Sequence, residues 1–92
     1  MTVNYIEQLA ERIKSNLSAD VLPDDSYPLL LMYAVLARVK GPETTLEDVH
    51  DAWTAWMSMR GKQHESSVPF AELPHAVQGE DSPFLRAILE SL

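Results

Sequence analysis

The sequence predicts an all-α protein, a compact bundle of about four helices with an ordered, proline-containing loop before the last helix. Apolar residues recur at intervals of three and four, which is the spacing of one helix face. Capping residues and glycine or proline stop signals bracket these apolar segments. No alternating run of four to eight residues resembles a strand. Since 92 residues are enough for one domain, we expect residues 1–92 to form a single helical domain.

The first helix is expected from about Tyr5 to Leu17. Asn4 and Glu7 have the spacing of a capping box. The apolar residues that follow repeat at helical intervals: Ile6, Leu9, Ile13 and Leu17. Residues 18–27 then contain one proline, three aspartates and two serines, a composition typical of turns.

The second helix is the segment LLLMYAVLARVK, capped by Asp25 or Ser26, with Pro28 in its first turn. Its end is expected at Gly41-Pro42, because glycine followed by proline stops a helix. The segment is apolar almost all round, so it must be covered on several sides. Either the other helices cover it, or one side is left for a second copy of the chain.

The third helix has the clearest boundaries. Thr44 with Glu47 and Thr45 with Asp48 offer overlapping capping boxes, and Gly61 marks the end. The apolar residues of this helix share one face: Leu46, Val49, Trp53, Trp56 and Met57.

Residues 62–79 contain two prolines and two histidines. We expect an ordered loop with one or two short helical turns, because four separated apolar residues are available to pin it to the core: Val68, Phe70, Leu73 and Val77. Asp81 or Ser82, followed by Pro83, then begins the last helix.

Charge and composition narrow the classes of function. The net charge is −7 and no basic patch is present, which argues against a nucleic-acid-binding protein. No stretch approaches the roughly 20 apolar residues of a membrane span. The first residues do not resemble a signal peptide and the chain has no cysteine, so we expect a cytoplasmic protein, in the host cytoplasm if a phage encodes it, without membrane contact.

No catalytic or metal-binding motif is recognisable. His50, His64 and His75 lie fourteen and eleven residues apart, which matches no local zinc motif. Ser66 and Ser67 follow His64 closely, but no nucleophile elbow surrounds them. We therefore expect no enzyme activity and no cofactor.

Two tryptophans three residues apart, Trp53 and Trp56, are neighbours on the third helix. Either both belong to the core, or one is partly exposed and anchors a binding surface, since tryptophan is enriched at binding hot spots. The candidate binding residues are His50, Trp53, Trp56, His64 and Phe70.

The segments VHDAW (49–53) and HESSVPFAEL (64–73), with Asp81, resemble part of the RyR domain first described in ryanodine receptors. The resemblance covers about half of the chain. The matching positions are His50, Trp53, His64, Val68, Pro69, Phe70, Leu73 and Asp81. The chain lacks the W-x-Y-G hairpin of that family, and Glu65 replaces a proline. The chain as a whole also resembles small uncharacterised proteins of actinobacteria and their phages.

Three functions follow as expectations. The first is a non-enzymatic interaction module that binds a protein partner or forms a homodimer through spare apolar surface of the second and third helices. The second, implied by the RyR resemblance, is a sensor of a nucleotide-like small molecule, with His50, Trp53 and His64 lining a shallow pocket. The third is an acidic mimic of nucleic acid, which blocks a nucleic-acid-binding protein.

Overall fold

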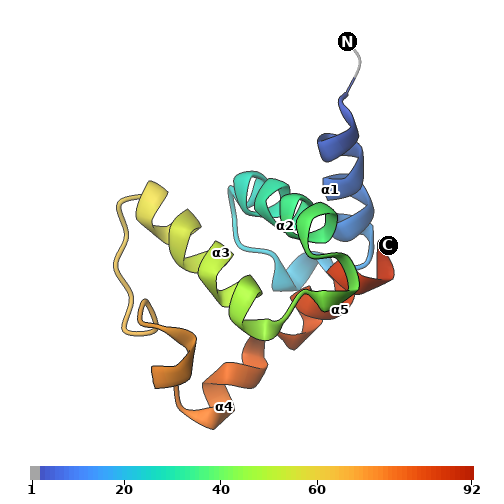
Figure 1. Ribbon diagram of the computed structural model, residues 1–92. Coiled ribbons are helices and arrows are strands. Elements are labelled where there is room, and N and C mark those ends of the chain that lie inside the picture. The colour runs from blue at the N-terminus through green and yellow to red at the C-terminus, as the bar shows by residue number, and fades with distance from the viewer. Residues whose placement is uncertain (1–2) are drawn as a thin grey trace.

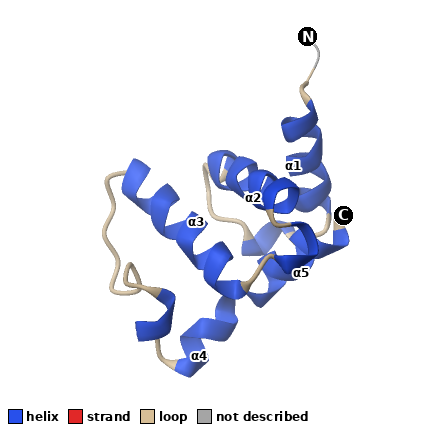
Figure 2. Cartoon of the chain, in the orientation of Figure 1, coloured by secondary structure: helices blue, strands red, loops and turns tan. Residues whose placement is uncertain are grey.

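The computed structural model describes residues 3–92 (Figure 1). In this range the α-helices are α1 (Tyr5–Ser15), α2 (Tyr27–Val39), α3 (Leu46–Met59), α4 (His75–Gln78) and α5 (Ser82–Glu90). No strand is found among the described residues (Figure 2). The predicted all-α bundle is therefore confirmed, with α4 as an additional single turn. No helix of residues 3–92 is long and apolar enough to cross a membrane.

Helix α1 begins with the predicted capping box. The Asn4 side chain accepts a hydrogen bond from the Glu7 backbone N–H at 2.8 Å, and the Asn4 backbone N–H donates to Glu7 Oε1 at 3.1 Å. The helix ends at Ser15 rather than Leu17. Asn16 caps it and donates its side-chain amide to the carbonyl of Ala87 at 3.1 Å. This contact with α5 requires the chain to leave the helix two residues earlier than the apolar spacing predicted.

Helix α2 packs against α1, α3 and α5. One side of it is buried: Leu29, Leu30, Tyr33, Ala34 and Ala37. Another side is open, since Val35 is 47% exposed and Val39 is 76% exposed. Ser26 occupies the N-cap position without a side-chain capping bond. Gly41, with φ +53°, follows the helix where the sequence predicted its end.

Helix α3 carries the second predicted capping box. Thr45 Oγ1 accepts from the Asp48 N–H at 3.2 Å, and the Thr45 N–H donates to Asp48 Oδ2 at 2.9 Å. Thr44 has a different role, because it is buried and its hydroxyl donates to the carbonyl of Gly41 at 2.7 Å. Gly61 follows the helix with φ +68°, in the left-handed region that favours glycine.

The segment between α3 and α5 is ordered, as predicted. It contains two 3₁₀ turns, Phe70–Glu72 and Gly79–Asp81, on either side of α4. The side-chain amide of Gln78 donates to the carbonyls of Phe70 and Leu73, both at 3.1 Å, and Leu73 is buried. Both 3₁₀ turns pack against α3. Helix α3 thus lies between the α2–α5 core and this segment (Figure 1).

Candidate binding site

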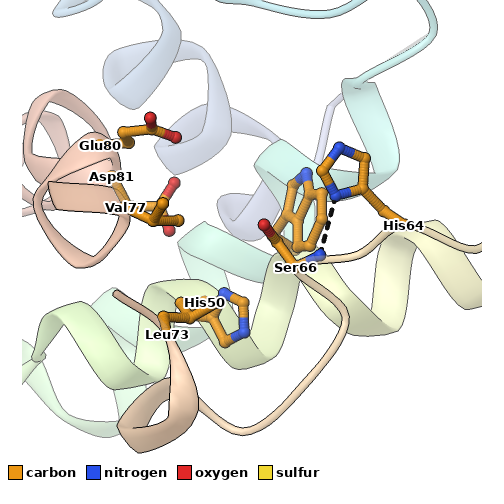
Figure 3. A pocket seen from close by; sticks show the side chains of 8 residues that line it. His50, His64, Ser66, Leu73, Val77, Glu80 and Asp81 are labelled. Carbon is orange, nitrogen blue, oxygen red and sulfur yellow. Dashed lines mark hydrogen bonds between the residues drawn. The ribbon is translucent and has the colours of Figure 1, made fainter. Parts of the chain in front are cut away.

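A pocket of about 190 Å³ opens between α3 and the segment that joins it to α5 (Figure 3). We call it the α3 pocket. Its lining residues are His50, Trp53, His64, Ser66, Leu73, Val77, Glu80 and Asp81. Three separate pieces of chain therefore meet here: one face of α3, the residues after Gly61, and the turn before α5.

Helix α3 contributes His50 and Trp53. Residues three apart lie side by side on a helix, and the two rings stack with centroids 5.7 Å apart and planes at 25°. His50 is only 3% exposed, and its Nε2 lies 2.6 Å from the carbonyl oxygen of Val68. Since a carbonyl only accepts, Nε2 must carry the proton. The other nitrogen, Nδ1, has no hydrogen-bond partner among residues 3–92 and is an acceptor in the neutral ring.

His64 closes the pocket from the loop side. Its exposed ring meets Trp53 nearly edge-on, with centroids 5.5 Å apart and planes at 85°. Its Nδ1 accepts the backbone N–H of Ser66 at 3.0 Å (Figure 3). This bond holds the ring in place and occupies the Nδ1 lone pair. The nitrogen is therefore not free to act as a base toward the Ser66 hydroxyl.

Two carboxylates come from the 3₁₀ turn before α5. Glu80 is exposed, whereas Asp81 is partly buried at the N-cap position of α5, without a side-chain capping bond. Burial raises the pKa of the Asp81 carboxyl, with a smaller rise from the nearby Glu80 and an opposing effect of His50. The ion pair seen among the described residues joins Lys40 to Asp48, at 2.9 Å, and does not involve Asp81. No lysine or arginine is among the residues that line the pocket.

The candidate residues His50, Trp53 and His64 are thus brought together. Phe70 lies next to His50, with ring centroids 6.1 Å apart, but is not among the lining residues. It packs on the buried ring rather than facing the pocket.

Trp56, although one of the candidate binding residues, does not line the α3 pocket and has the core position that was the first of the two alternatives. It is 2% exposed within the hydrophobic core, and the Arg60 guanidinium lies 4.4 Å from its ring centroid. Three residues along a helix correspond to a rotation offset of roughly 60°. This offset is sufficient to separate Trp56, in the core, from Trp53, in the pocket.

Sequence reasoning missed Ser66, Val77 and Glu80 as pocket residues, and saw Asp81 chiefly as a helix start. Their approach to α3 depends on the path of residues 62–79. The composition of that segment does not specify this path. The one sequence signal that could have placed Asp81 in the pocket was its presence among the positions that carry the RyR resemblance.

A second hollow, of about 490 Å³, lies between α1 and α2 and is mostly apolar. Its lining residues are Asn4, Ile6, Glu7, Leu31, Met32 and Val35. We call it the α1–α2 groove. Part of the apolar surface of α2 that the core leaves uncovered therefore lies beside α1.

Metal binding finds no support in the geometry. Within residues 3–92, no group of three histidine, aspartate or glutamate side chains is placed to hold a metal ion. The α3 pocket combines aromatic walls, imidazoles and carboxylates, which suits non-covalent recognition.

The family comparison covers nearly the whole chain. The model of a domain of unknown function, DUF7701, matches residues 4–92. No curated protein and no solved structure matches the chain. The five α-helices of residues 3–92 and every residue that lines the α3 pocket lie inside the matched range.

Proposed function

The chain belongs to the DUF7701 family, whose function is unknown, and we propose that it is a non-enzymatic module that binds a protein partner through the α3 pocket. A side chain of the partner enters the pocket between Trp53, His64 and Asp81. The observation that carries this proposal is the pocket itself, a concave site where aromatic and polar groups from three parts of the chain converge.

The size of the pocket favours a side chain over a whole metabolite. Sites for drug-sized ligands and cofactors measure roughly 300–1,000 Å³, whereas this pocket measures about 190 Å³. One large amino-acid side chain is the natural occupant of such a volume. The rest of the partner would then lie on the surrounding surface, as in interfaces where one anchor residue fills a central pocket.

The arrangement of His64 and Ser66 supports a binding role over a catalytic one. A serine nucleophile needs its hydroxyl within hydrogen-bond reach of a base. Here the Ser66 backbone N–H, and not its hydroxyl, bonds to His64 Nδ1.

The second candidate is the small-molecule sensor implied by the resemblance to RyR domains. Five of the eight positions that carry this resemblance line the α3 pocket: His50, Trp53, His64, Leu73 and Asp81. Phosphorylated ligands fit poorly, however, because the pocket offers two carboxylates and no lysine or arginine. A thermal-shift screen of nucleotides and signalling dinucleotides tests it. Saturation at a hundred times the dissociation constant adds about 2.7 kcal/mol of stability, and the partner-binding proposal expects no such shift.

The proposal places the module in the cytoplasm of an actinobacterium, or of the host of a phage, following the resemblance of the chain to small proteins of those sources.

An acidic mimic of nucleic acid is the weaker alternative. It requires carboxylates gathered on one face, and no contact or distance described above favours it.

A displayed library of random peptides tests the proposed function directly. The wild-type protein is expected to enrich peptides that Trp53→Ala and His64→Ala no longer retain. Val35→Glu, in the α1–α2 groove, is the matched control and should retain them. The absence of any enriched peptide, or enrichment that Val35→Glu alone abolishes, would overturn the proposal.

A further inference from the structure

We infer that the side chain that enters the α3 pocket is cationic, and that arginine fits it best. This inference rests on the proposed function and adds the chemistry of the occupant. It follows from the polar groups of the pocket, from the lack of a lysine or arginine among its lining residues, and from the aromatic wall.

The polar groups of the pocket are mostly acceptors. Glu80 and Asp81 supply carboxylate oxygens. When the His50 ring is neutral, its Nε2 donates to the Val68 carbonyl and Nδ1 is an acceptor, on a ring that lines the pocket. A ligand that carries several N–H donors complements this set, and a guanidinium carries five.

No lysine or arginine lines the pocket beside the Asp81 carboxylate, where only His50 opposes the rise in its pKa. The carboxylate is partly buried, and the ion pair among residues 3–92 lies elsewhere, between Lys40 and Asp48. A partly buried carboxylate without a counter-charge is costly for the free protein. A cation that enters the pocket would remove this cost, whereas an anion would increase it. The net charge of −7 acts in the same direction at long range, because it attracts a basic segment of a partner.

The aromatic wall distinguishes arginine from lysine. Tryptophan is the best aromatic partner for a cation, and the flat guanidinium also stacks on rings and binds carboxylates with two parallel hydrogen bonds. Trp53 and the carboxylates of Glu80 and Asp81 line the same small pocket. Lysine offers the charge without the flat shape, so we expect it to bind more weakly.

The test uses the peptides enriched by the displayed library together with synthetic variants of the strongest one. We expect one position of the enriched peptides to be arginine, with lysine as the secondary choice. Replacement of that arginine by citrulline, which is neutral and nearly isosteric, should weaken binding at least about ten-fold, as lost charge-assisted bonds do. Raising the salt concentration from about 50 to about 500 mM should weaken binding further, because salt screens partly exposed charges.

Substitutions of the pocket carboxylates test the same contact from the side of the protein. Asp81→Asn and Glu80→Gln should each weaken the arginine peptide about five- to ten-fold and leave the citrulline peptide nearly unchanged. Asp51→Asn is the control, because Asp51 is an exposed carboxylate of α3 that lines a different hollow. Its effect should remain below about two-fold.

The outcomes separate the two proposals. Peptides that need Trp53 and His64 but present a neutral or acidic anchor would overturn the cationic occupant and leave the partner-binding function standing. If no peptide is enriched and butylguanidinium does not bind in the pocket either, the proposed function and this inference both fail. Binding of butylguanidinium in the pocket, without any arginine peptide, would support the cationic chemistry and overturn the protein partner.

Discussion

The Nε2 atom of His50 lies 2.6 Å from the carbonyl oxygen of Val68, and this hydrogen bond fastens the loop after α3 to the helix. His50 is 3% exposed, so its side chain has little access to water as an alternative partner. The same bond determines which nitrogen of the ring remains an acceptor. One buried contact thus positions the loop and shapes the chemistry of the pocket.

Replacing His50 by leucine should destabilise the protein. The Val68 carbonyl then loses its donor in a part-buried position, at a cost of about 1–3 kcal/mol in the free energy of unfolding. Urea unfolding followed by circular dichroism measures the change. His75→Ala is the control, since His75 is exposed on α4, and should stay within about 0.5 kcal/mol of wild type. Equal effects of the two changes would mean that the bond to Val68 is not structural.

Asp81→Asn should stabilise the protein at pH 7 while it weakens partner binding. Burial, opposed by His50 and aided by Glu80, raises the pKa of Asp81 in the folded state. Burial also raises the pKa of Tyr33, with a smaller contribution from the charge of Asp81. The folded state therefore binds the Asp81 proton more tightly than the unfolded state does. The penalty is complete above the folded pKa and disappears as the pH falls through it.

Urea unfolding of wild type and Asp81→Asn at pH 7 and at pH 4 checks this sign. The stabilisation by asparagine should be largest at pH 7 and shrink at pH 4. Asparagine remains a good residue for the N-cap position of α5, so the helix start is preserved. Destabilisation at pH 7 would show that the negative charge is satisfied in the free protein.

The two tryptophans should differ in environment. The Trp53→Phe variant leaves Trp56, which is 2% exposed, and its fluorescence should resist quenching by acrylamide. The Trp56→Phe variant leaves the partly exposed Trp53, whose fluorescence should be quenched readily. Truncation to alanine should cost about 3–5 kcal/mol at Trp56 and clearly less at Trp53. Equal quenching of the two variants would contradict the assignment of Trp56 to the core and Trp53 to the pocket.

Gly61→Ala should destabilise the turn that directs the chain from α3 into the pocket loop. No atom lies within 4 Å of an added Cβ at this position, so only the left-handed backbone, φ +68°, opposes the change. The expected cost is about 1–2 kcal/mol. Gly79→Ala is the matched control, because its site is equally open and its φ is −82°. That variant should be neutral or slightly more stable in thermal unfolding, and an equal loss in both would argue against backbone strain at Gly61.

Local signals predicted most of the fold. The capping boxes at Asn4 and Thr45, and the glycines at 41 and 61, act within one or two turns of chain, so their chemistry is legible in the sequence. The early end of α1 could not be predicted from the sequence, because the hydrogen bond between Asn16 and Ala87 joins residues 71 positions apart.

The candidate site was predictable in part for the same reason. His50 and Trp53 are helical neighbours, so their spacing alone placed them together. The contributions of Ser66, Glu80 and Asp81 depend on how residues 62–81 fold back on α3, which long-range packing determines. Trp53 and Trp56 share the apolar face of α3. Trp56 is buried in the core and Trp53 is not, and this difference depends on how the neighbouring helices pack against α3.

The most direct test of the α3 pocket is a ¹H–¹⁵N NMR titration of the full chain with the strongest arginine-containing peptide. We expect the largest shifts at the Trp53 indole N–H and at the backbone amides of Ser66 and Asp81, with the Val35 amide unchanged. The citrulline peptide at the same concentration should produce much smaller shifts at these positions. Shifts that centre on Val35 and the α1–α2 groove, or equal shifts with both peptides, would contradict the account.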